Sequence, residues 1–155
     1  LRALRDDPIP FLATHEEEER LSVEDFAARL RSSDPATQVL GAFHDAVLVG
    51  MLGFLRHARL KARHRASLWG MYVAPEQRRR GFASELVSTA IARLSAVGDI
   101  EQVELTVVIG AEPARQLYVT AGFRVQGLLR RAMKSGNDYF DEEELVIWLK
   151  DVPKG

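Results

Sequence analysis

The chain contains no cysteine, which excludes disulfides, thiolate metal sites and a cysteine nucleophile. Its longest apolar run, residues 39–55, is interrupted by His44 and Asp45 and is shorter than the ~20 apolar residues that span a bilayer. The basic start LRALRDDPIP leads into no apolar segment, so we expect no signal peptide. With 21 basic and 22 acidic side chains, the net charge is only -1. These absences argue against membrane or general nucleic-acid binding and fit a reducing cytoplasm.

What remains is the composition of a globular protein, with 46% hydrophobic and 28% charged residues. We expect a single domain over residues 1–155, with substrate-side helices and a loop in 1–38 and the core sheet in 39–150. Ser22, followed three residues later by Asp25, predicts a helix at about 23–31. The chain starts with Leu1 rather than methionine, so upstream residues remain conceivable.

From residue 39 onward, the hydrophobic periodicity predicts a mixed order of strands and helices. In chain order these are a hairpin at 39–43 and 47–55, a strand at 66–74, a helix at 81–98, a strand at 103–109, a helix at 113–122 and strands at 123–129 and 144–149. The order indicates an α/β fold, a mixed sheet with flanking helices. Its strand–helix–strand unit makes the third and fourth strands parallel neighbours, with ligands expected at their carboxyl ends.

The segment PEQRRRGFASEL, residues 75–86, joins the third strand to the following helix. A helix start exposes unpaired N–H groups and partial positive charge, so anions bind there. Gly81 and Ala83 would leave room for phosphate oxygens, and three preceding arginines add charge. Neither the dinucleotide G-x-G-x-x-G pattern nor the Walker lysine is present. We therefore predict a diphosphate site that does not hydrolyse nucleoside triphosphates.

At this junction the chain resembles the GNAT superfamily of N-acetyltransferases, whose acyl-CoA motif is [QR]-x-x-G-x-[GA]. The motif is matched by residues 78–83, within the longer match LWGMYVAPEQRRRGFASELV. ARQLYVTAGF and NDYFDEEELVIWL resemble further family segments, and the resemblance covers about 39–150. It implies a GNAT-like acyl-CoA N-acyltransferase fold with acetyl-CoA as cofactor.

Two departures from the family pattern are visible. Many members have asparagine three residues before the alanine that Ala114 matches, where this chain has Ala111, so a cofactor contact or a helix cap is lost. The family also usually opens with a strand before its first helix. That first strand is either missing here or lies upstream.

The resemblance implies that the third and fourth strands splay apart and that pantetheine amides bind between them like an added strand. A strand N–H would polarise the thioester carbonyl, and Tyr118 would be the general acid. The cofactor-binding residues carried over from the family are Met71, Tyr72, Val73, Arg78, Arg79, Arg80, Gly81, Phe82, Ala83 and Ser84. No carboxylate on the third strand stands out as a base, and Thr106 offers none on the fourth, which favours a water relay or an acceptor of low pKa.

Simpler structural interpretations remain beside these. The arginine triplet alone is typical of a solvated turn, and Tyr118 of a core aromatic. The basic tip at 56–65 is expected to be solvated, with His57 and His64 as surface residues rather than metal ligands. The acidic segments 15–20 and 141–144 either face an acceptor or form a helix start and a charged strand edge.

Together these observations predict an enzyme that transfers acetyl directly from acetyl-CoA to a primary amine, without a covalent enzyme intermediate. The alternatives are a non-catalytic acyl-CoA-binding sensor or interaction module and, less favoured, an RNA-binding domain. Expected partners are a small-molecule amine or a peptide N-terminus, with no nucleic acid, membrane or metal. A homodimer is compatible with the sequence, and the acceptor's identity stays open.

Overall fold

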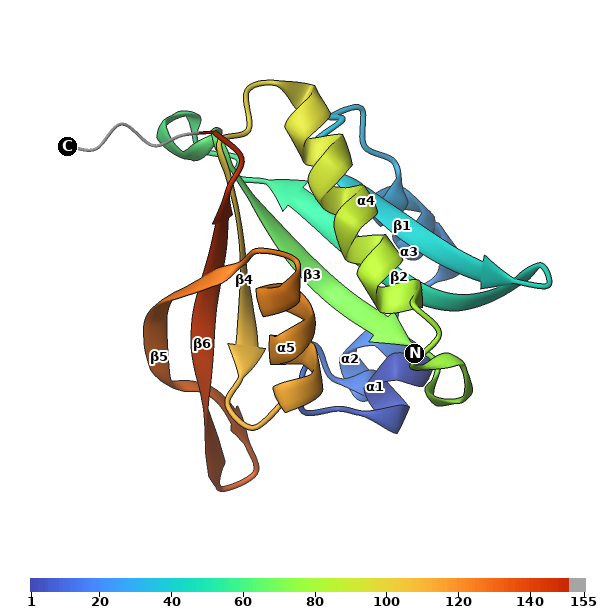
Figure 1. Ribbon diagram of the computed structural model, residues 1–155. Helices are drawn as coiled ribbons and strands as arrows, with labels where there is room; N and C mark the ends of the chain where they lie inside the picture. Colours follow the sequence, from blue (N-terminus) through green and yellow to red (C-terminus); the bar gives the residue numbers. More distant parts are fainter. Residues whose placement is uncertain (151–155) are drawn as a thin grey trace.

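The computed structural model describes residues 1–150, which form a mixed α/β fold around one six-stranded sheet (Figure 1). The strand order is β1-β2-β3-β4-β6-β5. The elements are α1 (Arg2–Asp6), α2 (His15–Glu19), α3 (Val23–Leu30), β1 (Gln38–His44), β2 (Val47–Arg56), β3 (Arg65–Val73), α4 (Phe82–Val97), β4 (Gln102–Val108), α5 (Glu112–Thr120), β5 (Arg124–Ser135) and β6 (Asp138–Trp148). The predicted fold class is confirmed, and two short helices precede the predicted one.

Capping residues determine where the N-terminal helices begin. The Ser22 hydroxyl accepts from the N–H of Asp25 while the Asp25 carboxylate accepts from the N–H of Ser22, so α3 begins where predicted. Thr14 and Glu17 form the same reciprocal box at α2. The acidic segment 15–20 is therefore a helix start, in which acids also complement the helix dipole.

The strand pairings follow the predicted order. β1 and β2 form an antiparallel hairpin whose turn residues, Asp45 and Ala46, have φ values of 48° and 62°. β3 and β4 are parallel neighbours, as the strand–helix–strand unit predicts. β6 pairs antiparallel with both β4 and β5.

The hydrophobic core lies mainly between the sheet and two helices. α4 and α5 lie in front of the sheet in Figure 1, with α4 crossing β1 to β3 and α3 behind β1 and β2. The buried side of α4 consists of Leu86, Val87, Ala90 and Leu94, residues of the predicted apolar stripe. Among residues 1–150, no helix combines the length and apolarity needed to cross a bilayer.

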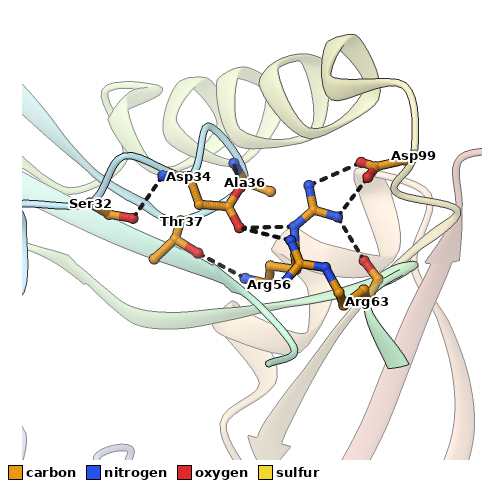
Figure 2. Close-up of polar contacts among 7 residues, drawn as sticks. All are labelled: Ser32, Asp34, Ala36, Thr37, Arg56, Arg63 and Asp99. Atoms are coloured by element: carbon orange, nitrogen blue, oxygen red, sulfur yellow. Dashed lines mark hydrogen bonds and ion pairs between the residues drawn. The ribbon is translucent and has the colours of Figure 1, made fainter. Parts of the chain in front are cut away.

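A buried arginine ties three loops together at the end of the sheet away from α1 (Figure 2). Arg56 is 8% exposed, and its guanidinium donates to Asp34 at 2.9 Å and to both carboxylate oxygens of Asp99 at 3.0 Å. It also donates to the carbonyl oxygen of Arg63 at 2.9 Å. The hydrogen bond from Arg56 lowers the pKa of the Asp99 carboxyl. The network connects the segment before β1, the β2–β3 loop and the α4–β4 loop.

Candidate functional site

β3 and β4 are paired for only part of their length. Their register covers three residue pairs, the last of which is Ser67 with Glu104. Figure 1 shows the two strands diverging toward their arrowheads. Residues 68–73 of β3 and 105–108 of β4 therefore have backbone edges without a strand partner on the sides that face each other. The splayed strands implied by the family resemblance are present.

A β-bulge lies in the part of β3 that pairs with β2 but not with β4. Met51 is opposite Tyr72 and Gly53 is opposite Trp69, so β3 contains one extra residue. Gly70 provides the bulge with a φ of 64°. Such a bulge bends the strand and changes the direction of its backbone groups beside the gap.

The turn after β3 has a row of free N–H groups. Arg79 and Gly81 have positive φ values of 60° and 89°, the left-handed backbone conformation that occurs in anion-binding nests. Among residues 1–150, the N–H groups of residues 79–84 have no hydrogen-bond acceptor. The first backbone bond of the helix is donated by Glu85 to the carbonyl oxygen of Gly81. Six consecutive donors are thus available at the start of α4.

The three arginines of this turn differ in their surroundings. Arg78 Nε donates to the carbonyl oxygen of Val73 at 3.0 Å and so ties the turn to the end of β3. Arg80 contacts Gln77 at 2.6 Å and His44 at 3.2 Å. No described side chain contacts the Arg79 guanidinium through a hydrogen bond or ion pair. Of the predicted phosphate-facing arginines, Arg79 is the one whose guanidinium is not engaged within the fold.

Gly81 has a conformational reason to be glycine, in addition to the predicted room for phosphate oxygens. A β carbon at this position would meet no atom within 4 Å, so space within the protein does not demand glycine. Its left-handed φ of 89° does, because other residues adopt this conformation at a cost. Phe82 and Ala83 are partly buried and pack against the hydrophobic core. The small size of Ala83 therefore also suits core packing.

Tyr72 links the turn region to the N-terminal helix. Its hydroxyl donates to Asp6 at 2.8 Å, and Arg2 in the same helix bonds to Asp6 and, in the turn, to Glu76. Burial, followed by the hydrogen bond to Asp6, raises the pKa of Tyr72. The side chain of Tyr72 thus holds α1, leaving its backbone as the part that borders the gap.

Tyr118, the predicted general acid, lies on α5 with its ring in the core. The side chain is 6% exposed and packs edge-to-face on Phe123, with ring centroids 5.8 Å apart. Burial raises the pKa of Tyr118 to about 12. Its hydroxyl bonds to no described residue, yet no fully enclosed side-chain polar atom of residues 1–150 lacks a partner, so the oxygen reaches accessible space. Tyr118 is therefore a core aromatic with an available hydroxyl.

The β2–β3 connection differs from the expected solvated tip at its start, where Arg56 is buried and His57 contacts other side chains. His57 Nε2 lies 3.0 Å from Ser67 Oγ and 2.8 Å from Glu104 Oε1. Arg65 Nε donates to the other Glu104 oxygen at 2.9 Å. His57 is therefore a partly buried residue just after β2, in a polar cluster with residues of β3 and β4, rather than a freely solvated one. Within the described part of the chain, no group of three or more His, Asp and Glu residues is arranged to hold a metal ion.

Strand alternation divides the acidic segment 141–144 between the two faces of β6. Glu143 pairs with Arg115 of α5 at 2.6 Å, and Asp141 accepts from the N–H of Arg131 at 2.7 Å. Glu142 and Glu144 point to the face away from α5. Within residues 1–150, neither receives a hydrogen bond or forms an ion pair. The sequence alone could not separate these roles, because the assignment requires the strand register.

Comparisons with known proteins agree with this geometry. A sequence profile described as "Acetyltransferase (GNAT) family" matches residues 1–123. The chain is 34% identical over 95 residues to the Bacillus subtilis (strain 168) protein named "Uncharacterized N-acetyltransferase YoaA". This alignment covers 61% of the chain and 51% of YoaA, so the chain spans about half the length of this curated relative.

Two solved structures illustrate the shared fold. An N-acetyltransferase from Staphylococcus aureus Mu50 has a TM-score of 0.76 at 17% identity, covering 96% of this chain and 90% of its own. A phosphinothricin acetyltransferase from Sinorhizobium meliloti, solved in complex with AcCoA, has a TM-score of 0.74 at 19% identity, covering 83% and 70%. With the profile match over most of the sequence, the chain belongs to the acetyltransferase (GNAT) family.

Proposed function

We propose that the protein is an N-acetyltransferase that moves an acetyl group from acetyl-CoA to a primary amine. The observation that carries the proposal is the row of six free N–H groups at residues 79–84 beside the unpaired edges of β3 and β4. The family membership and the AcCoA complex of the Sinorhizobium meliloti relative support it.

The residues present suit such a ligand. The N–H groups at the start of α4 and the Arg79 guanidinium would receive the diphosphate. The backbone of Met71, Tyr72 and Val73 borders the gap and would pair with amide groups as an added strand does. When bound, acetyl-CoA supplies the activated thioester, and the chain supplies position and proton transfer.

The pKa values of Tyr118 and of the acceptor amine are compatible with direct attack by a neutral amine. The Tyr118 hydroxyl, with its pKa raised to about 12, stays protonated at neutral pH and can donate a hydrogen bond to a departing thiolate. At pH 7, neutralising a lysine-like amine of pKa ~10.4 costs about 4.6 kcal/mol, compared with about 1.4 kcal/mol for an amine of pKa ~8. An acceptor with a lowered amine pKa therefore needs little help from a base.

Calorimetric titration with acetyl-CoA and with acetyl-pantetheine, which lacks the diphosphate, tests the binding site. We expect affinity for acetyl-pantetheine to be lower by about 100-fold, because charge-assisted bonds to the diphosphate are lost. Absence of heat with acetyl-CoA would contradict the proposal.

A thiol-release screen with amines of several classes, followed by mass measurement of the products, tests the reaction. Release that depends on the amine, with an acetylated product, is the expected result. Tight coenzyme binding without release for any amine would instead indicate a non-catalytic acyl-CoA-binding module, the rival function.

A further inference from the structure

The face of β6 directed away from α5 carries two carboxylates without partners. Glu142 and Glu144 are two residues apart and so share this face. Glu143, between them, points the other way and is paired with Arg115 of α5. Of these three glutamates, the one that faces α5 has a partner among residues 1–150 and the other two do not.

The burial of Glu142 makes its lack of a partner unusual. The residue is 7% exposed, and no described residue bonds to its carboxylate. Buried carboxylates in folded proteins are nearly always paired or hydrogen-bonded. Because residues 1–150 contain no fully enclosed side-chain polar atom without a partner, the carboxylate oxygens reach accessible space. The missing partner of Glu142 can therefore come from outside the chain, as a positively charged donor.

The two carboxylates lie one strand away from the gap between β3 and β4. Glu144 is opposite Thr106 of β4, and Glu142 is opposite Val108, both in the part of β4 whose other edge is unpaired. Neighbouring strands are about 4.8 Å apart, so a group held here sits beside the gap rather than in it. This offset suits a charge that belongs to the acceptor but does not react.

The residue opposite Glu144 on β5 has no side chain. Gly127 is opposite Glu144, and a β carbon there would lie 3.4 Å from Glu144 Oε2. The carboxylate thus lies over the Gly127 backbone.

The same face of β6 continues into a cavity. Phe140, two residues before Glu142, lines a hollow of about 880 Å³ between the N-terminal helices and the β5–β6 hairpin. Met133 and Ile9 provide further apolar lining. The ionisable side chains lining the cavity are those of Arg5, His15, Glu16, Glu19 and Lys134. Glu142 and Glu144 are not among the residues that line this cavity, which begins farther along β6 at Phe140.

We propose that Glu142 and Glu144 bind a second, non-reacting ammonium group of the acceptor, so that alkyl diamines and polyamines are the preferred amines. This inference rests on the proposed acetyl transfer. The reacting nitrogen must be neutral at the gap, whereas an ammonium beside it donates charge-assisted hydrogen bonds to the two carboxylates. A monoamine of equal length lacks that second charge and leaves Glu142 unpaired.

Steady-state thiol release with acetyl-CoA tests the preference, using 1,4-diaminobutane and 1-aminobutane as a matched pair. We expect kcat/KM to be at least about tenfold higher for the diamine, the effect of one charge-assisted bond. Glu142→Gln and Glu144→Gln should remove this preference by raising KM for the diamine. Both should lower kcat/KM far more for the diamine than for the monoamine and leave the affinity for acetyl-CoA unchanged.

Glu143→Gln is the control, because it removes the same charge from the opposite face of the same strand. We expect it to keep the diamine preference. Circular dichroism and melting temperature monitor folding. If Glu142→Gln fails to fold, Glu144→Gln provides the test, because Glu144 is less buried. Equal kcat/KM for the two amines, or loss of the preference in Glu143→Gln as well, would overturn the inference while acetyl transfer stands. Failure to bind acetyl-CoA, or no acetylation of any amine, would overturn the proposed function.

Discussion

Gly81 and Gly98 stand at the two ends of α4 in nearly the same left-handed conformation, with φ values of 89° and 87°. A β carbon would meet no atom within 4 Å at either position. The two glycines therefore have matched conformational and steric surroundings. Only Gly81 lies within the row of free N–H groups.

Comparing alanine variants of Gly81 and Gly98 distinguishes the contribution of Gly81 to coenzyme binding from its contribution to backbone conformation. Gly81→Ala and Gly98→Ala should each lower the free energy of unfolding by about 1 kcal/mol, the cost of a left-handed alanine. Gly81→Ala should in addition weaken acetyl-CoA binding by about tenfold, because strain at residue 81 redirects the N–H groups. Chemical denaturation and calorimetric titration measure the two effects. Equal coenzyme affinity in both variants would remove Gly81 from the binding site.

Tyr118→Phe should lower kcat by about 100-fold while the dissociation constant for acetyl-CoA stays unchanged, because the substitution removes a proton donor and keeps the ring. The ring continues to pack on Phe123, so folding should be preserved. Stopped-flow thiol release and calorimetry provide the measurements. Wild-type kcat in this variant would show that Tyr118 serves only the core.

The raised pKa of Tyr118 also predicts a pH dependence of stability. In the folded protein the pKa is about 12, compared with ~10 in an unfolded chain. The stability linked to this raised pKa is fully present below pH 10 and is lost as pH rises through 12. Tyr118→Phe should therefore lose less stability than the wild type between pH 10 and 12. Denaturant titrations across this range test the difference, and parallel curves would contradict it.

Local signals made much of the fold predictable from sequence. The Ser22–Asp25 box, the glycine ends of α4 and the strand–helix–strand order depend on neighbouring residues, and all are present in the structure. The splayed strands followed from the family resemblance rather than from composition or spacing. The bulge at Gly70 could not be located, because it depends on register with β2.

The contacts of individual site residues were less accessible to prediction. Arg78 is tied to Val73, and His57 contacts Glu104 of a strand 47 positions later in the chain, an arrangement that only the folded sheet creates. The same holds for Glu142 and Glu144. Their role differs from that of Glu143 because they lie on the face of β6 that α5 does not cover, and the sequence does not show which face that is. The residue types were visible in the sequence, but their partners were not.

The alanine at position 111, where many family members have asparagine, should lower the stability of the fold. It is the N-cap of α5 and provides no side-chain acceptor. Since Pro113 lacks an N–H, an asparagine at position 111 would cap the N–H of Ala114. Ala111→Asn should therefore raise the free energy of unfolding by about 1 kcal/mol, measured by denaturant titration. No gain in stability would show that the backbone at residue 111 does not allow the cap to form.

Arg56→Met should destabilise the fold far from the proposed acetyl-CoA site. The substitution keeps an unbranched side chain but leaves Asp34 and Asp99 without their shared donor. The expected loss is about 2 kcal/mol, the usual range for bonds to charged groups. Arg63→Met is the control. Its side chain is more exposed and lies 3.9 Å from Asp34, so the loss should stay below about 1 kcal/mol.

The pH dependence of the Arg56 effect follows from Asp99, whose pKa the Arg56 hydrogen bond lowers. A lowered folded-state pKa contributes stability above the ordinary value of ~3.9, and this stability is lost as pH falls through the lowered value. The difference between wild type and Arg56→Met should therefore be largest at neutral pH and shrink below about pH 4. Unfolding curves at pH 7, 5 and 3 measure it. A difference that stays constant down to pH 3 would assign the role of Arg56 to packing instead of to its carboxylate partners.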